Sequence, residues 1–331
     1  MLQRNFGSDP EYFITDRKTV KTEYGELVNV IPPASLITDL GVQYTFSKNN
    51  KRILIDNPDY NWIEDGAALE LNYKKPHNNP GELNRVNIAA KRVLKTFLQG
   101  IDTSLIYAES VLGYFSLKDF SEGRDASFLD CIRFGCDEDK FPNLYLILGF
   151  EKDTCKIVDA SKHEYRYAGG HIHTQNMSKY PDIYVENLEY ASILFDFIVG
   201  TRNILFEREE SILNQEKARL KYYGRPGRVR IQKYSDKVNG LEYRPPSNQW
   251  INNAYNCNSI LYAVDIASNI VEKGGSKKFF NNFQDRVDEV WSALTLHDKK
   301  LSENILVDSL TWAVDNYYTD MEGVENVCRN I

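Results

Sequence analysis

The stretch DGAALELNY, from Asp65 to Tyr73, carries the pattern of a half-buried β-strand with acidic residues on it and beside it. From Ala67 onward apolar and polar side chains alternate, which is the period-two signature of a strand with one packed face and one open face. Glu70 and Asn72 lie two positions apart, so the strand directs both side chains to the same face. A strand face that carries a carboxylate is the first indication of a chemical site.

A second acidic segment, FGSDPEYFI (Phe6–Ile14), predicts a turn followed by a short strand. Asp9 and Glu11 are two apart, so we expect both on one face of this strand. Carboxylates on one sheet face repel each other, and a bound hard cation is one reason to keep them together. Magnesium is held in proteins by a few carboxylates, water and substrate phosphates. The alternative is that these acids face solvent on amphipathic strands.

Two of the five histidines lie in GGHIHTQ, from Gly169 to Gln175. On a strand, His171 and His173 share one face, and the double glycine allows close approach of the backbone to a ligand. Such a pair can hold zinc, contact a phosphate or a substrate carboxylate, or assist a magnesium site. The simpler interpretation is a strand with two half-exposed histidines.

The segment KYYGRPGRVRIQKY (Lys221–Tyr234) is a basic loop, broken by glycine and proline, that enters a predicted strand. Arg225, Arg228 and Arg230 suit a phosphate, because forked guanidinium donors match its oxygens. The Walker A pattern GxxxxGK[ST] is absent, so this is a different kind of phosphate loop, or a solvated basic turn.

A final polar pair lies in GLEYRPPSNQW (Gly240–Trp250), where Glu242 and Arg244 share one strand face and two prolines end the strand. The two side chains could form an ion pair. They could also hold a metal ion and an acyl phosphate respectively.

The predicted helices lie mainly in the second half of the chain, and no linker divides the sequence. We therefore expect one mixed unit of strands and helices with a helical C-terminal section. A possible strand spans 104–115. Helices are predicted over 83–100 (with Val86, Ala89, Val93, Leu94 and Phe97 on one face), 187–206, 207–220, 258–273, 279–296 and 304–318.

Composition excludes several classes of protein. The chain has 331 residues, a hydrophobic fraction of 42% and a charged fraction of 26%, as ordinary globular proteins do. A net charge of −7 argues against non-specific nucleic-acid binding by the whole surface. The five cysteines form no CxxC pair, and we see no signal peptide and no apolar run long enough to span a membrane. We therefore expect a soluble protein of the reducing cytoplasm.

These segments together resemble a known family. GSDPEYF, DGAALELN, RFGCDEDKF, GGHIHTQ, YYGRPGRVRIQKY and GLEYRPPSNQW occur in the order found in the phage-associated carboxylate–amine ligase family, type 2, of the glutamine synthetase-like amidoligases. The resemblance covers roughly Phe6 to Trp250, and Glu138 stands where the family segment leads us to expect proline. It implies an α+β fold in which a curved antiparallel sheet, flanked by helices, has a concave active-site face. Residues 1–256 would form the catalytic domain, and residues 257–331 a helical section packed on it.

The resemblance also implies an ATP- and Mg²⁺-dependent ligase that uses two or more ions and joins a small-molecule or peptide carboxylate to an amine through an acyl phosphate. The location would be the cytoplasm, that of the host if a phage encodes the chain, and a homo-oligomer is compatible with the family. Asp65, His171 or Glu242 would be the base. The implied roles are metal binding for Asp9, Glu11, Glu70 and Glu242, catalysis for Asp65, His171, Glu242 and Arg244, and cofactor binding for His173, Arg225, Arg228 and Arg230.

Three alternatives stay open at this stage. A zinc-dependent hydrolase could use His171 and His173, with a third ligand from Asp9, Glu11 or His163. The chain could instead be a catalytically inactive binding or virion-associated protein, although its full set of acids and arginines argues against loss of chemistry. A nucleic-acid-associated role through the basic stretch 219–230 is the weakest of the three, because the chain is acidic overall.

Overall fold

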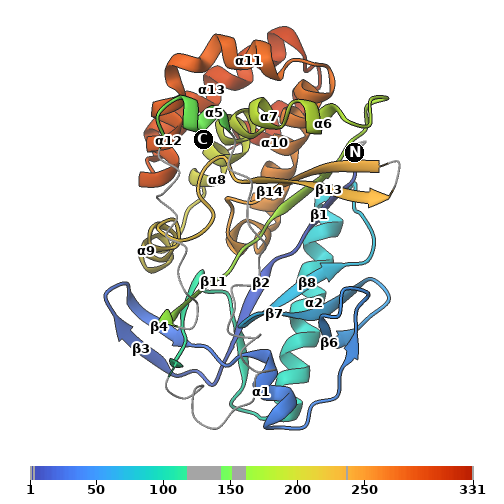
Figure 1. Cartoon of the computed structure of the whole chain (residues 1–331), viewed down its shortest axis with the longest axis vertical. Helices are drawn as coiled ribbons and strands as arrows, with labels where there is room; N and C mark the ends of the chain where they lie inside the picture. The colour runs from blue at the N-terminus through green and yellow to red at the C-terminus, as the bar shows by residue number, and fades with distance from the viewer. Residues whose placement is uncertain (1, 3, 118–142, 151–161, 236–237, 330–331) are drawn as a thin grey trace.

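The computed structural model of the chain describes all residues except 1, 3, 118–142, 151–161, 236–237 and 330–331. Its strands form three hydrogen-bonded sheets, and its C-terminal helices lie together at the top of the view in Figure 1. The predicted α+β class, with antiparallel sheets and helices, is confirmed. The strands divide among three sheets, and the curvature of a single concave sheet stays a prediction.

The six-stranded sheet brings together two of the acids that the sequence predicted to bind metal. Its antiparallel pairing places Glu11 directly opposite Glu70. Gly66 begins the two-residue turn between β7 and β8 with φ of 59°, a left-handed conformation that glycine adopts without strain. The strand order is β5 (Thr45–Phe46), β6 (Arg52–Asp56), β7 (Tyr60–Asp65), β8 (Ala68–Tyr73), β2 (Glu11–Thr15) and β9 (Ile106–Ala108).

The first four-stranded sheet aligns a row of polar residues. Its antiparallel register places His173 between Gly7 and Glu242, and Glu242 opposite Arg230. Residues directly opposite each other in antiparallel strands direct their side chains to the same face. The strand order is β1 (Phe6–Ser8), β12 (Ile172–Gln175), β14 (Val238–Tyr243) and β13 (Val229–Ser235).

The other four-stranded sheet corrects one prediction. The single strand expected over 104–115 is two short strands, and they belong to different sheets: β9 to the six-stranded sheet and β10 to this one. Residues 109–111 lie between them and redirect the chain. The order is β11 (Tyr165–Tyr167), β10 (Leu112–Tyr114), β4 (Gly25–Asn29) and β3 (Thr19–Thr22), in which β10 and β4 are parallel; α1 (Pro33–Thr38) follows β4.

Helix α2 (Pro80–Ile101) begins where the Asn79 side chain accepts hydrogen bonds from two backbone amides, and it packs on the six-stranded sheet. The face predicted for it is right in part: Leu94 is buried and Val86 and Phe97 pack against the core, whereas Val93 is 39% exposed. The buried face includes two polar side chains that pattern analysis counts as solvent-facing. Asn87 donates a hydrogen bond to a backbone oxygen, and Lys91 pairs with Glu109 at 2.6 Å. Satisfied polar groups can therefore occupy a buried face.

The C-terminal helices and the strands of the histidine-bearing sheet share one hydrophobic core, in which Ile172 and Leu241 pack with residues of α10 and α13. α10 crosses the domain boundary predicted after residue 256, and that division stays a prediction. No described helix is long and apolar enough to span a membrane. The helices are α5 (Asn143–Ile147), α6 (Ile183–Glu186), α7 (Leu188–Phe195), α8 (Thr201–Ile204), α9 (Glu210–Arg219), α10 (Ala254–Glu272), α11 (Ser276–Phe283), α12 (Val287–Leu296), α13 (Lys299–Asn316) and α14 (Met321–Cys328).

Candidate active site

Two groups of side chains that could bind a metal ion form where the chain passes from one sheet to the next. The histidine group consists of Asp9, His173 and Glu242, and the carboxylate group consists of Glu11, Asp65 and Glu70. Within each group, one ligand atom per residue lies within 4.8 Å of the others. The predicted metal-binding acids are thus present in these two groups.

The prediction that Asp9 and Glu11 share a strand face is wrong. Asp9 follows β1 of one sheet, Glu11 begins β2 of another, and Pro10 lies between them. Proline has no backbone N–H to donate to a sheet, so it separates the two strands. Each acid consequently joins a different group.

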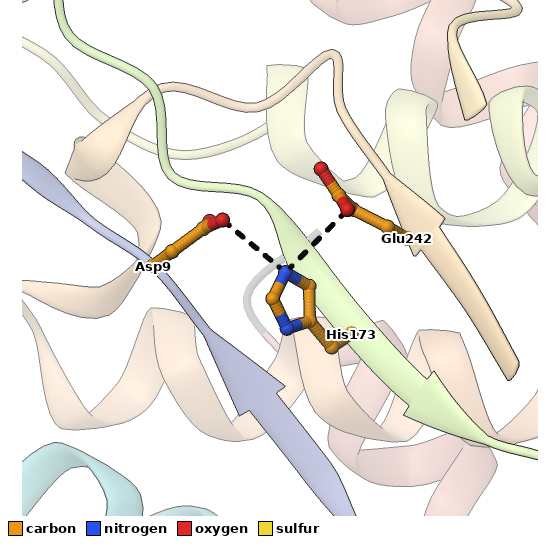
Figure 2. A group of neighbouring side chains, drawn as sticks. All are labelled: Asp9, His173 and Glu242. Atoms are coloured by element: carbon orange, nitrogen blue, oxygen red, sulfur yellow. Dashed lines mark ion pairs between the residues drawn. The ribbon is translucent and has the colours of Figure 1, made fainter. Parts of the chain in front are cut away.

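The histidine group and its neighbour His171 bring nitrogen and carboxylate oxygen atoms close together. His173 Nε2 lies 3.3 Å from Asp9 Oδ2 and 3.9 Å from Glu242 Oε2, as Figure 2 shows. His171 Nδ1 lies 3.1 Å from Asp9 Oδ1 and 3.4 Å from Glu242 Oε1. Asp9 Oδ1, His171 Nδ1 and His173 Nε2 are buried and make no hydrogen bond within the described part of the chain. Buried polar atoms are rarely left so, which fits a cation bound by the histidine group.

The orientation of His171 fits a metal ligand. Its Nε2 forms a hydrogen bond with the hydroxyl of Tyr223, which also accepts one from Arg244 at 3.0 Å. In the tautomer with the proton on Nε2, the lone pair of Nδ1 faces two carboxylates. Ligating histidines commonly have their second ring nitrogen hydrogen-bonded in this way. The donor set of the histidine group, nitrogen with carboxylate oxygen, suits a divalent cation.

Electrostatics keep the acids of the histidine group ionised. Burial raises the pKa of Asp9, but the positive charges that His171 and His173 carry when protonated outweigh it and hold the pKa well below its ordinary value. Burial also raises the pKa of Glu242, and the two histidines again reverse the direction and lower it. The pKa of His173 is raised despite burial, because Asp9 and Glu242 stabilise its protonated form.

The carboxylate group has the opposite electrostatics. Burial, with repulsion from Asp65, raises the pKa of Glu11 to about 7 and that of Glu70 well above its ordinary value. Burial likewise raises the pKa of Asp65, although Lys51 opposes the shift. Lys51 Nζ lies 2.5 Å from Asp65 Oδ1 and 3.5 Å from Glu70 Oε2. Two buried carboxyl groups and a partly buried one lie around the Lys51 ammonium group, so their environment favours positive charge, and all-oxygen donors suit Mg²⁺.

The basic side chains of the site gather around the carboxylate of Glu242. It is fully buried and accepts hydrogen bonds from Arg230 Nε at 2.9 Å, from Arg244 and from Gln232. Arg230 keeps 36% of its side chain exposed, so it borders solvent beside the histidine group. Two arginines next to a cation site are an arrangement that suits phosphate oxygens.

Two of the predicted cofactor-binding arginines lie elsewhere in the loop. The Arg225 side chain donates to the backbone oxygens of Leu220 at 2.7 Å and Lys221 at 3.2 Å, where α9 ends. Arg228 connects the loop to β14, because its backbone oxygen accepts from Arg244 N at 3.1 Å. Their predicted phosphate roles stay predictions, as does every role assigned above. The motif segment 133–142 lies outside the described residues.

His163, considered as a zinc ligand, belongs to neither group of the described chain; it contacts Tyr167 and Tyr222. Lys51 and Gln232 contact residues of the site, although the sequence did not predict a role for either. Gln232 lies two positions after Arg230, so the period of the strand could have identified it. Lys51 carries no such signal, since its contact depends on how the β5–β6 hairpin folds against β7 and β8.

The double glycine serves close packing of backbone. A Cβ on Gly170 would lie 2.4 Å from the backbone oxygen of Ser247, and one on Gly169 would lie 2.9 Å from His171 Nε2. Gly169 N also donates to Glu11 Oε2 at 2.7 Å, and Trp250 Nε1 donates to Gly170 O at 2.7 Å. The glycines therefore let three segments meet at the site.

Comparisons with known proteins give little further information. No protein-family model matches the chain, and no curated protein matches it. Among solved structures, it is similar to a chain in the crystal structure of the complex between the prokaryotic ubiquitin-like protein Pup and its ligase PafA. That match has a TM-score of 0.39 and 9% sequence identity, and it covers 98% of this chain and 72% of the other. Similarity this low supports no statement about activity, and membership of the ligase family stays a prediction.

Proposed function

We propose that the chain is an ATP- and Mg²⁺-dependent carboxylate–amine ligase that forms an amide through an acyl phosphate. The observation that carries the proposal is the presence of two groups of potential metal ligands, each buried or partly buried, with Arg230 and Arg244 beside one of them. Phosphoryl transfer depends on positioning and on neutralising charge, and this arrangement supplies groups for both. The order of the six sequence motifs supports the same activity.

Each of the two groups would bind one metal ion. Asp9, His173 and Glu242 would hold one ion, and Glu11, Asp65 and Glu70 a second. Bound Mg²⁺ would supply charge neutralisation to the phosphate oxygens of ATP. The arginines would orient the transferring phosphoryl group.

The reaction has two steps. The substrate carboxylate attacks the γ-phosphorus, which forms an acyl phosphate and releases ADP. The amine nitrogen then attacks the acyl carbon, phosphate leaves, and a base accepts the proton of the amine. Asp65, His171 and Glu242 are the candidate bases.

A zinc-dependent hydrolase is the second candidate. His171 Nδ1 and His173 Nε2, which make no hydrogen bond within the described residues, favour it, because imidazole nitrogen suits zinc. A hydrolase of this kind has no need for the carboxylate group or for the arginines. Metal content and ATP dependence separate the two candidates.

The test is ADP formation by the purified protein with ATP, Mg²⁺ and mixtures of carboxylates and amines. Glu70→Gln keeps the shape of the side chain and removes its charge, and exposed Glu303 on α13 provides the matched control, Glu303→Gln. We expect substrate-dependent ADP formation that Glu70→Gln abolishes and Glu303→Gln retains. Full activity of Glu70→Gln would contradict the proposal. Stoichiometric zinc together with ATP-independent hydrolysis would favour the hydrolase.

A further inference from the structure

A cavity of about 480 Å³ opens beside the histidine group. It lies between β1, β12 and the end of β8, and His173 and Ser8 are among its lining residues. Its volume is within the range of pockets for small organic molecules, about 300–1,000 Å³. Because His173 belongs both to the cavity and to the histidine group, the cavity adjoins that group.

The lining of the cavity is basic. It includes Lys74, Lys75 and His173, and none of its described lining residues is an acid. The two lysines pair with Asp56 and Asp59, which lie outside the lining, and their side chains stay 34% and 66% exposed. Exposed ion pairs are weak, so either lysine can turn to a bound anion at little cost. Phe6, Tyr73 and Pro76 add apolar surface, which suits a carbon skeleton between charged ends.

The sheet places this cavity and the arginines at opposite ends of one row. In the order β1, β12, β14, β13, the cavity lies at the β1 and β12 end, whereas Arg230 lies on β13. His173 on β12 and Glu242 on β14 lie between them in the strand order, and Figure 2 shows these two side chains next to each other. If the phosphates of ATP lie near Arg230, the cavity at the other end of the sheet is left for the carboxylate substrate.

We propose that this cavity binds the carboxylate substrate, and that Lys74 and Lys75 select organic acids that carry a second negative charge beyond the reacting carboxylate. The reacting carboxylate lies toward His173 and the second anionic group lies toward the lysines. This inference rests on the proposed ligase activity.

The experiment reverses the charge of Lys74 and Lys75, which together form what we call the rim of the cavity. The variant is Lys74→Glu with Lys75→Glu, and the control is Lys299→Glu with Lys300→Glu, an adjacent pair of exposed lysines at the start of α13. The probes are succinate and glutarate, with butyrate and valerate as acids that lack the second charge. Hydroxylamine serves as the amine, so that an acyl phosphate gives a hydroxamate.

We expect the rim variant to raise KM for the dicarboxylates about tenfold or more, as loss of attraction and new repulsion require, with KM for ATP unchanged. The control should resemble the unmodified protein, and the monocarboxylates should respond much less. A rise in KM for ATP instead, or equal KM values for glutarate in all three proteins, would overturn the proposal.

A binding measurement separates this inference from the proposed function. If no acid in the panel is turned over, the ligase activity is unsupported, and calorimetric titration of the Mg²⁺-loaded protein with glutarate still tests the cavity. Binding that the rim variant loses and the control keeps supports the cavity as an anion subsite. Binding that the rim variant keeps, or no binding of any of the four acids, overturns it.

Discussion

Substitution of Asp196 by asparagine should remove a large pH dependence of stability. Asp196 is fully buried at the start of the π-helical turn Asp196–Gly200, which interrupts the long helix predicted over 187–206. Its carboxylate accepts hydrogen bonds from Tyr145, from Tyr243 at 2.7 Å and from the backbone amide of Gly227. Tyr243 lies between Glu242 and Arg244, and Gly227 lies in the arginine loop. The buried carboxyl group thus connects two parts of the candidate site.

The magnitude follows from the pKa. Burial raises the pKa of Asp196 from 3.8 to about 7, although its three hydrogen bonds oppose the shift. Between these values the folded protein keeps a proton that the unfolded chain has released. This group therefore stabilises the fold fully below about pH 4, and its contribution is lost as the pH rises through about 7. A shift of about three units corresponds to about 4 kcal/mol at about 1.4 kcal/mol per unit.

The assay is urea unfolding of the unmodified protein and Asp196→Asn at several values between about pH 4.5 and about pH 7.5. The other carboxyl groups titrate alike in both proteins, so the difference between the two free energies of unfolding isolates this one. The asparagine variant should be the less stable at the acid end and should lose its disadvantage, by up to about 4 kcal/mol, toward neutral pH. Exposed Asp285→Asn is the control. A difference that stays constant across the range would refute the reasoning.

Three further perturbations test the site. Glu242→Gln should destabilise the protein by about 3–5 kcal/mol in chemical unfolding, because it leaves the buried guanidinium group of Arg244 without its anion; a change below about 1 kcal/mol would mean that solvent compensates it. Gly170→Ala places a Cβ 2.4 Å from the backbone oxygen of Ser247, so it should lower the melting temperature and the affinity for metal, whereas Gly100→Ala, which has open space on α2, should be neutral or stabilising by up to about 1 kcal/mol. Lys51→Met removes the ammonium group from the carboxylate group, so calorimetry should find tighter Mg²⁺ binding than in the unmodified protein, and weaker binding would show that Lys51 assists the ion instead.

The sequence by itself determined the local elements. Alternation between residues 67 and 73 predicted β8, the HxH spacing predicted two histidines on one strand face, and apolar periodicity located α2, α10 and α13. These features depend on side chains within a few positions of each other, and the periods of 2 and 3.6 residues express them directly. Most of the residues in the two groups could therefore be chosen as candidates before their positions were known.

Only the tertiary structure decided how those candidates divide. Asp9 and Glu11 are neighbours in sequence, yet they belong to different groups, because Pro10 separates strands of two sheets. Asp9 instead meets Glu242, and the contact of Lys51 with Asp65 depends on the pairing of β6 with β7. Contacts between distant segments depend on sheet order, register and packing, and no local period records them. The residue types of the site are thus a property of the sequence. The division into two groups, the contact of the Lys51 ammonium group with the carboxylate group, and the cavity lined by Lys74 and Lys75 arise from the way the sheets meet.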